Sequence, residues 1–386
     1  MGFGLNEDQL MLQKNVRAFL EKEIAPLVNE YEEKYAPYPR DILVDLIKKL
    51  LPWDYCLGIV KKKDGGTEIP YVSNGVLQEE LSRIWPSLAV SLGAGGGYLI
   101  GKLATEEQKK KYLPGMQSLD ILGSFALTEP NVGSDLRGVE TTAVLQGDHY
   151  VLNGQKAWVT GGNIAEVAIV FASEDRSKGV DGLGIFLVDR RESPFEATII
   201  PKIGLRCAPS ALMTFTDCKV PKANLVAGAG TGAMAKLTGE LGFTRATVGI
   251  FSVGIAQASI EAGIKYAQQR IQFGRKIGKF QLIQNLIAES VVETEAARLL
   301  LYKAFSNLDE GKEATIEACG GKYFANEVAL KAASNAMKVH GAWGLAEEYP
   351  VERYFRDARA MFPPEGNPEI QKMIVGGRVL GMSALV

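Results

Sequence analysis

The stretch HYVLNGQKAWVT at residues 149–160 decides the middle of the fold. Two apolar runs flank Asn153-Gly154, a dipeptide that favours the tight turn of a β-hairpin, so we expect two antiparallel runs joined there. Outward from this stretch, short segments rich in Val, Ile, Phe and Thr alternate with Gly, Asn, Asp and Pro. They predict strands at 122–128, 139–146, 149–159, 166–173, 183–189, 196–200 and 211–217.

Helical periodicity lies on both sides of this β region. Asn6 and Gln9 have the spacing of a capping box, and the helix that they begin would end before Pro26. Further helices are predicted at 39–51, 74–84, 105–113, 233–270, 281–309, 312–340 and 368–385. We therefore expect an α+β protein with an N-terminal α-helical domain (1–121), a middle β-barrel or sandwich domain (122–230) and a C-terminal four-helix bundle (231–386).

Composition excludes several classes of function. The 386 residues include 43 Lys and Arg against 45 Asp and Glu, which argues against nucleic-acid binding. The four cysteines form no CxxC pair and only two histidines are present, so we expect no metal site. Neither a signal-peptide pattern nor an apolar run of about 18 residues is found, so we expect no membrane span. The expected location is the cytoplasm, or an organelle matrix if a presequence was removed.

The scarcity of histidine also bears on chemistry. Because His149 and His340 are the only imidazoles, an enzyme of this sequence would use a carboxylate or a cofactor as its base. The Gly-rich stretches GAGGG (93–97) and GAGTG (228–232) precede no Lys-Ser/Thr and follow no strand of a βαβ unit. We interpret them as turns or close helix contacts, so a nicotinamide-binding domain is not supported.

Three other segments leave two interpretations open. FALTEPNVGSDL (125–136) is either a capped turn or a loop that holds a phosphate or polar heterocycle, and Trp158 with Thr160 would be core residues or a cofactor wall. RIQFGRKIGKFQLIQ (270–284) is a solvated charged face or a loop directed at a phosphate. In MFPPEGNPEIQKM (361–373), Glu365 is either a partner of a helix dipole or a rigidly held general base.

Six segments together closely resemble the acyl-CoA dehydrogenase family over essentially the whole chain. They are FALTEPNVGSD, NGQKAWVT, YAQQRIQFGRKIGKFQ, KVHGAWGL, EEYPVERYFRDAR and PPEGNPEIQ, and they follow one another in the order of that family. The resemblance implies an FAD cofactor, an acyl-CoA substrate, a homotetramer, and reoxidation by electron-transfer flavoprotein. It implies a 2-enoyl-CoA product, formed by transfer of the α-proton to Glu365 and of the β-hydride to flavin N5.

The resemblance also assigns roles to single residues. Glu365 would be the catalytic base. Substrate contacts would come from Ser134, Phe243, Arg245, Glu365 and Gly366. FAD contacts would come from Phe125, Leu127, Thr128, Gly133, Ser134, Trp158, Thr160, Arg270, Gln272, Phe273, Gln281, Lys338, Gly341, Ala342, Asn367 and Glu369. Among these, Arg270, Gln272, Phe273 and Gln281 match residues that reach the FAD of a neighbouring subunit. Some branches of the family carry the base at the position of Thr244, where this chain has no carboxylate.

The sequence departs from the family pattern at several positions. Its Gly-Gly-x-Gly stretch reads Gly341-Ala342-Trp343-Gly344, and Lys338 stands where Gln is usual. Pro364 precedes the base, Asn367 replaces a Thr, Gly242 replaces an Asp and Gly161 replaces an Asn. The expected acyl-tail region, 87–100, has no charged residue, and Ala89 lies where glutaryl-CoA enzymes carry Arg. This argues against a dicarboxylic acyl group and leaves room for a branched or cyclic one.

Rival functions remain on the same scaffold. The reaction direction is open, because one site stabilises the same transition state both ways. The alternatives are therefore an enoyl-CoA reductase working with a flavoprotein, an oxidase, and a non-catalytic acyl-CoA-binding protein.

Overall fold

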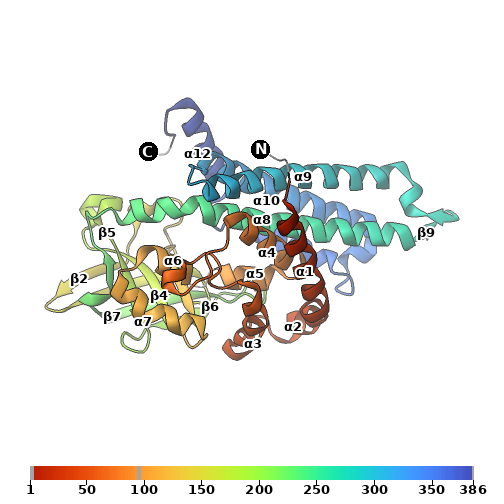
Figure 1. Ribbon diagram of the computed structural model, residues 1–386. Helices are drawn as coiled ribbons and strands as arrows, with labels where there is room; N and C mark the ends of the chain where they lie inside the picture. Colours follow the sequence, from red (N-terminus) through yellow and green to blue (C-terminus); the bar gives the residue numbers. More distant parts are fainter. Residues whose placement is uncertain (1–3, 94–96, 385–386) are drawn as a thin grey trace.

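The computed structural model describes residues 4–93 and 97–384. Helices of the N-terminal region, a β-sheet and a set of long helices follow one another along the chain, and the longest helix runs over the sheet and beyond it (Figure 1). The predicted order of helical, β and helical regions is therefore confirmed. Most of the GAGGG stretch, residues 94–96, lies outside the described residues, so its interpretation stays a prediction.

The N-terminal region begins with the expected capping box. Asn6 Oδ1 accepts a hydrogen bond from the amide of Gln9, and Gln9 Oε1 accepts one from the amide of Asn6, both at 2.9 Å. The helices of this region are α1 (Glu7–Glu23), α2 (Val28–Lys34), α3 (Arg40–Leu50), α4 (Tyr71–Ile84), α5 (Pro86–Gly93), α6 (Gly97–Leu103) and α7 (Glu106–Gln117). The sequence patterns predicted α1, α3, α4 and α7 and missed α2, α5 and α6, which have only seven or eight residues each.

The middle region forms one sheet with the strand order β6-β7-β3-β2-β4-β5-β8, and β1 pairs in parallel with β4. Its strands are β1 (Gly123–Ala126), β2 (Thr142–Gln146), β3 (His149–Thr160), β4 (Val167–Ser173), β5 (Leu183–Asp189), β6 (Glu196–Ile199), β7 (Ser210–Pro221) and β8 (Leu225–Ala227). Within the described residues β6 and β8 are not paired with each other, so the sheet is not a closed barrel. Only β8 was not predicted.

The expected turn at Asn153-Gly154 is wrong. Strand β3 continues through this dipeptide, and the two-residue turn is Gly147-Asp148, between Gln146 of β2 and its partner His149. Gly147 has a φ of 63°, as the favoured hairpin turns require at that position. Gly154 serves a different purpose: a Cβ there would lie 2.6 Å from the Cα of Thr141, so only glycine allows the backbones to approach at this bulge.

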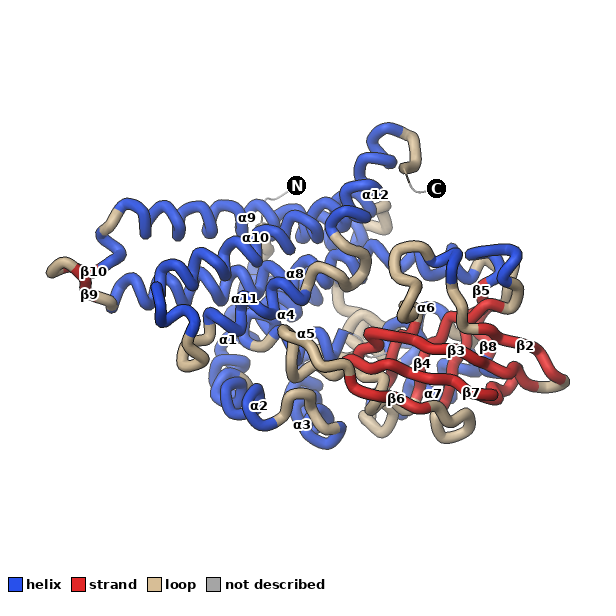
Figure 2. Tube along the Cα trace, turned by 180° about the vertical axis from the view of Figure 1, so that it is seen from behind, coloured by secondary structure: helices blue, strands red, loops and turns tan. Residues whose placement is uncertain are grey.

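The C-terminal region consists of α8 (Ala233–Gln269), α9 (Gln281–Asp309), α10 (Thr315–His340), α11 (Val351–Ala360) and α12 (Pro368–Leu380). Helices α8, α9 and α10 run alongside one another, and the hairpin of β9 (Ile271–Gln272) and β10 (Arg275–Lys276) joins α8 to α9 (Figure 2). A Cβ on Gly249 of α8 would meet Leu301 Cδ2 at 2.6 Å, so glycine permits this close helix packing. Helix α11 was not predicted.

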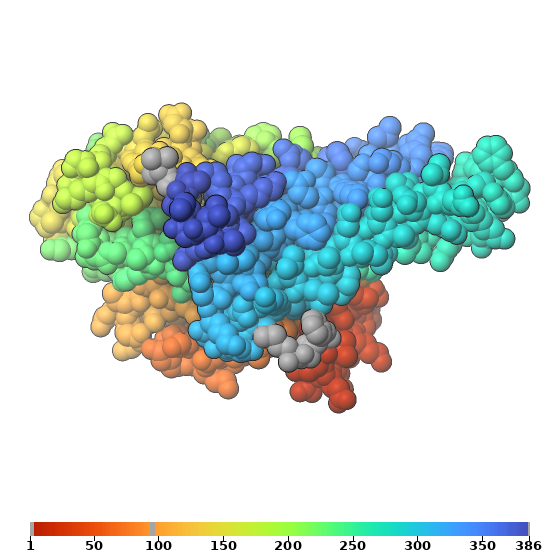
Figure 3. Space-filling view, turned by 90° about the horizontal axis from the view of Figure 1, so that it is seen from above, coloured from red at the N-terminus to blue at the C-terminus, as the bar shows by residue number. Residues whose placement is uncertain are grey.

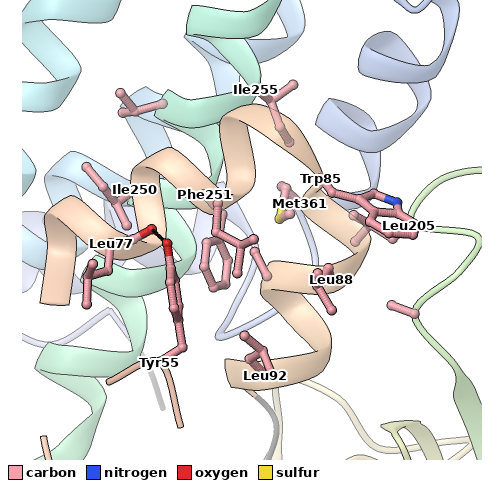
Figure 4. Close-up of a cluster of buried hydrophobic side chains, with 14 of the residues drawn as sticks. Tyr55, Leu77, Trp85, Leu88, Leu92, Leu205, Ile250, Phe251, Ile255 and Met361 are labelled. Carbon is pink, nitrogen blue, oxygen red and sulfur yellow. Dashed lines mark hydrogen bonds between the residues drawn. The ribbon is translucent and has the colours of Figure 1, made fainter. Parts of the chain in front are cut away.

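One hydrophobic core joins the regions. Trp85 and Leu88 pack beside Phe251 of α8, Leu205 from the β region and Met361 from the C-terminal region (Figure 4). By length and composition α8 could cross a membrane, but 78% of its most apolar window is buried inside the protein, as in the core helix of a soluble protein. We propose domain borders after residues 121 and 230. The first lies between the end of α7 at Gln117 and the start of β1 at Gly123, and the second between the end of β8 at Ala227 and the start of α8 at Ala233.

Candidate active site

Glu365 lies in a tight turn between α11 and α12. Its φ is 59° and that of Gly366 is 91°, so two successive residues have a left-handed backbone. Asn367 caps α12 by accepting a hydrogen bond of 2.9 Å from the amide of Ile370, and Pro368 occupies the first helical position. The turn therefore has defined geometry on both sides of Glu365, although a left-handed glutamate costs on the order of 1–3 kcal/mol of strain.

Three helical side chains hold this glutamate. The hydroxyl of Thr244 donates a hydrogen bond of 2.9 Å to Glu365 Oε2. Gln371 Nε2 donates to the backbone carbonyl of Glu365 at 2.8 Å, and Arg245 Nε lies 3.4 Å from the same oxygen. Arg245 thus contacts the turn of the candidate base directly. Because one carboxylate oxygen is fixed by Thr244, the half-buried carboxyl group is oriented in its site.

An aromatic cluster lies beside these residues on α8. The buried ring of Phe243 contacts the rings of Tyr71, Tyr98 and Phe305, with centroids 4.8–6.3 Å apart. The hydroxyl of Tyr98 donates to the carboxylate of Glu240, and burial, followed by the neighbouring Tyr71 and Glu240, raises the pKa of Tyr98. Phe243, expected as a substrate contact, is therefore packed in an aromatic wall.

The loop at 125–134 is attached to β3 by a buried ion pair. Lys156 Nζ lies 2.6 Å from Glu129 Oε1, and both side chains are almost completely buried. Lys156 also donates to the carbonyl of Leu127, and the amide of Ala157 donates to Thr128. Burial alone would raise the pKa of Glu129, but the Lys156 ammonium and the amides of Thr141 and Glu140 hold it below its usual range. The loop at 125–134 is thus held in place by the buried pair of Lys156 and Glu129.

Trp158 is not a core residue. It is 58% exposed and has a φ of 60°, and the pairing of β3 with β7 shifts register between Lys156 and Val159. This bulge turns a large aromatic side chain outward, as bulges beside functional sites do. Phe125 on β1 and Thr160 at the end of β3 are half-buried, while Gly133 and Ser134 in the loop are exposed. Together they form an aromatic and polar surface on the sheet.

The remaining predicted cofactor residues lie elsewhere. The β9–β10 hairpin is at one end of the molecule and the sheet is at the other (Figure 1, Figure 3). Phe273, at its tip, is 93% exposed with a φ of 51°. The residues that this arrangement separates from the sheet are Arg270, Gln272, Phe273 and Gln281. The exposed Lys338, Gly341 and Ala342 lie where α10 passes into a 3₁₀ turn. One chain alone does not gather all predicted cofactor residues.

Family comparisons identify the scaffold. Models described as the N-terminal, middle and C-terminal domains of acyl-CoA dehydrogenase match residues 6–120, 124–218 and 230–380. A glutaryl-CoA dehydrogenase of Desulfococcus multivorans is 36% identical, with 99% of each chain covered. The chain belongs to the acyl-CoA dehydrogenase family. It is therefore an oxidoreductase that acts on CH–CH bonds.

Two further relatives of this family show its range. A caffeyl-CoA reductase-Etf complex subunit of Acetobacterium woodii is 36% identical, with 97% of this chain and 99% of the relative covered. The structure of butyryl-CoA dehydrogenase from Megasphaera elsdenii has a TM-score of 0.92 at 33% identity, covering 98% of this chain and 100% of that one. Dehydrogenases and a reductase thus share this acyl-CoA dehydrogenase scaffold.

The acyl-CoA dehydrogenase family is FAD-dependent, and the residues on the sheet fit a flavin. The exposed indole of Trp158 suits an aromatic ring, and the hydroxyls of Thr128 and Thr160 suit polar ring atoms. A Cβ on Gly133 would meet nothing within 4 Å, so the loop has open space beside it. The described residues contain no group of three metal-binding side chains.

Several residues of the acyl-CoA dehydrogenase site were missed from the sequence. Lys156 and Glu129 brace the loop, whereas Lys322 and Gln371 bind the turn of Glu365. For Glu129 and Lys156 the only sequence signal was their presence in the segments 125–136 and 149–160. Lys322 gave no such signal, because it stands on a regular helix far along the chain from Glu365.

Proposed function

We propose that this acyl-CoA dehydrogenase removes hydrogen from the α and β carbons of an acyl-CoA thioester. Glu365 accepts the α-proton, and its backbone N–H polarises the thioester carbonyl, which makes that proton more acidic. When bound, FAD supplies the acceptor for the β-hydride. Thr244 keeps the carboxylate oriented, and Arg245 and Gln371 keep its backbone in place.

The hydrogen bond from Thr244 to Glu365 is the observation that carries this proposal. Neither histidine competes for the role of base. His340 is buried with Nδ1 2.7 Å from the carbonyl of Ala336, and His149 lies next to Asp148 in the β2–β3 hairpin. A carboxylate held at a fixed orientation, in a turn that strain makes costly, has the properties of a general base.

We propose that the cofactor residues on the sheet and those on the hairpin belong to one FAD site built from two chains. Within one chain the β9–β10 hairpin, which carries Phe273, lies far from the sheet, which carries Trp158 (Figure 1). This separation and the exposure of both rings support the arrangement. A homotetramer would supply it. The surface of α9 is consistent with association, since Leu282 and Val292 are 81% and 67% exposed.

The substrate and partner proposals are narrower. We propose an apolar, branched or cyclic acyl group, because Ser91, Leu92 and Gly97 of the predicted tail region line an otherwise mostly apolar pocket with Leu43 and Ile164. We further propose substrate contacts from Ser134 and Gly366, electron-transfer flavoprotein as the acceptor and a cytoplasmic location. The printed name of the Acetobacterium relative, an Etf complex subunit, supports the choice of acceptor.

The test is anaerobic titration of the purified protein with straight-chain, branched and alicyclic acyl-CoAs. The flavin absorbance should bleach with the preferred substrate. Glu365→Gln should abolish bleaching, whereas Glu107→Gln, an exposed carboxylate on α7 outside the predicted site, should not. Full bleaching by Glu365→Gln would remove the proposed base. A colourless protein that still binds acyl-CoA would instead indicate the non-catalytic function, and preference for unbranched chains would reject the substrate proposal.

Enoyl-CoA reduction is a second candidate, because a relative of equal identity is named a caffeyl-CoA reductase subunit. Mixing reduced enzyme with enoyl-CoA, and oxidised enzyme with acyl-CoA, compares the two directions. A much faster reductive half-reaction supports dehydrogenation, and a much faster reoxidation by enoyl-CoA supports reduction. Rapid reoxidation by oxygen alone would indicate an oxidase.

A further inference from the structure

Lys322 of α10 is a fully buried cation beneath the turn of Glu365. Its Nζ donates hydrogen bonds to the carbonyl of Gly366 at 2.7 Å, to Asn326 Oδ1 at 3.2 Å and to the carbonyl of Phe362 at 3.4 Å. All three acceptors are neutral. Within the described part of the chain, no carboxylate oxygen lies within 4.0 Å of this ammonium, so it has no ion-pair partner in direct contact.

The same face of α10 holds the rest of the turn. Asn326 Nδ2 donates to the carbonyl of Met361 at 3.1 Å and to Ser252 Oγ of α8 at 2.8 Å. Gln371 Nε2 donates to the carbonyls of both Glu365 and Gly366. Side chains therefore hold the backbone carbonyls before the turn and those of the two left-handed residues. Lys322 binds two of these carbonyls, those of Phe362 and Gly366.

We propose that Lys322 is a positioning residue for Glu365. Its hydrogen bond to the carbonyl of Gly366 keeps the strained turn in the conformation that presents the carboxylate of Glu365. This inference rests on the proposed role of Glu365 as the base.

The electrostatic surroundings agree with this role. Burial lowers the pKa of Lys322 to about 8, against the influence of Glu365, which raises it. The other groups that face the ammonium are Arg245 on α8, which lowers the pKa further, and Cys319 on α10, which raises it. An isolated buried ammonium is costly to the fold. The Lys322 ammonium is nevertheless buried without a carboxylate in direct contact, and it lies beneath the turn of the candidate base. A destabilising buried charge at such a position indicates a functional role.

The experiment compares Lys322→Met with Lys331→Met in the flavin-loaded protein. Lys331 stands on the same helix but is exposed and paired with Glu289 and Glu293. For Lys322→Met we expect the rate of flavin reduction by acyl-CoA to fall about tenfold or more, as for a lost hydrogen bond to a charged group. The dissociation constant for substrate should change less than about threefold, because Lys322 lies behind the turn. Lys331→Met should leave both unchanged.

Two readouts separate positioning from a merely structural role. The Tm of Lys322→Met should equal or exceed that of the wild type, because the buried charge is gone. The second readout is the contrast between rate and affinity: the reduction rate per bound flavin should fall at saturating acyl-CoA, while the dissociation constant for acyl-CoA stays within about threefold of the wild-type value. A lowered Tm with an unchanged reduction rate per bound flavin, or equal losses of rate and affinity, would overturn the inference.

A further variant and a control keep the result interpretable. Lys322→Gln keeps amide donors and removes the charge, and it is measured by the same criteria if Lys322→Met does not accumulate in folded form. Glu365→Gln is measured in parallel. Loss of reduction in Glu365→Gln with full activity in Lys322→Met refutes only the role of Lys322, whereas full reduction in Glu365→Gln refutes the proposed function.

Discussion

Thr244 Oγ1 and Glu365 Oε2 are joined by a 2.9 Å hydrogen bond, although 121 residues separate them in the chain. Thr244 belongs to α8 and Glu365 to the turn before α12, so the contact depends on the packing of the whole C-terminal region. The backbone of the turn fixes the position of Glu365, and the hydrogen bond from Thr244 fixes the orientation of its carboxylate. The first prediction follows from this contact.

Thr244→Val should slow flavin reduction by acyl-CoA about tenfold or more, because a hydrogen bond to a charged group is lost while the side-chain shape is kept. Stopped-flow absorbance measures the rate, and the dissociation constant for substrate should change little. Thr244→Ser keeps the hydroxyl and should retain most of the activity. Equal rates in the Val and Ser variants would show that the hydroxyl does not assist Glu365.

Lys156→Met should destabilise the β region by about 3–5 kcal/mol, since it leaves the buried carboxylate of Glu129 without its cation. Urea unfolding monitored by tryptophan fluorescence measures the loss. The double variant Lys156→Met/Glu129→Gln should lose clearly less than the sum of the two single variants, because the uncompensated charge is removed. Additive losses would mean that the two groups are not coupled. Flavin retention should also fall, because the pair braces the loop that carries Gly133 and Ser134.

Phe273→Ala should weaken association of the chains and flavin retention together. The ring is 93% exposed on a hairpin far from the sheet, so it has little to stabilise within its own chain. Analytical ultracentrifugation over a range of concentrations measures association, and flavin absorbance after gel filtration measures retention. Lys219→Ala, an exposed position on β7, serves as control. A variant whose association and flavin content equal those of the wild type would remove Phe273 from the proposed shared site.

Asp357→Asn should alter the pH dependence of stability. Burial, with the nearby Glu32, raises the pKa of Asp357 from 3.8 to about 7, and its Oδ1 accepts a hydrogen bond from the amide of Leu205. Between these pH values the folded state holds a proton that the unfolded state releases, so wild-type stability decreases as the pH rises through this window. The contribution is on the order of a few kcal/mol.

Urea unfolding at pH 5 and pH 8 tests this expectation. The Asn variant cannot ionise and still offers an oxygen to Leu205, so its gain in stability relative to wild type should be larger at pH 8 than at pH 5. A constant difference between the two proteins at both pH values would contradict the raised pKa of Asp357.

The sequence predicted the regular elements well where local signals act. Asn6 with Gln9 forms the expected capping box, and seven of the strands lie where alternating short segments placed them. The prediction of a turn at Asn153-Gly154 was wrong because this dipeptide can also occupy a bulge within a strand. Here Gly154 is required by the close approach of Thr141, which lies just before β2. Such a contact has no local sequence signal.

The residues of the candidate site likewise fall into those with a local sequence signal and those without one. Glu365 could be singled out because Pro364, Gly366 and Asn367 constrain it locally, and its catalytic role stays a prediction. Lys322 could not, because its contact with Gly366 arises when α10 packs behind the turn. The separation of Phe273 from the sheet likewise appears only once the chain is folded. Tertiary packing, not residue type, carries that information.

The left-handed backbone residues bear on thermostability engineering. Three of the eight non-glycine residues with positive φ in the described chain are Trp158, Phe273 and Glu365, all predicted site residues. Glycine would relax each of them but would delete the side chain that the site uses. Glu68, with a φ of 56°, is exposed and lies outside the predicted site. A designer seeking a more heat-resistant protein can therefore exchange Glu68 for Asn or Gly. The same exchange at Trp158 or Glu365 would remove a predicted site residue, so the strained backbone at these two positions has to be retained if their predicted roles hold.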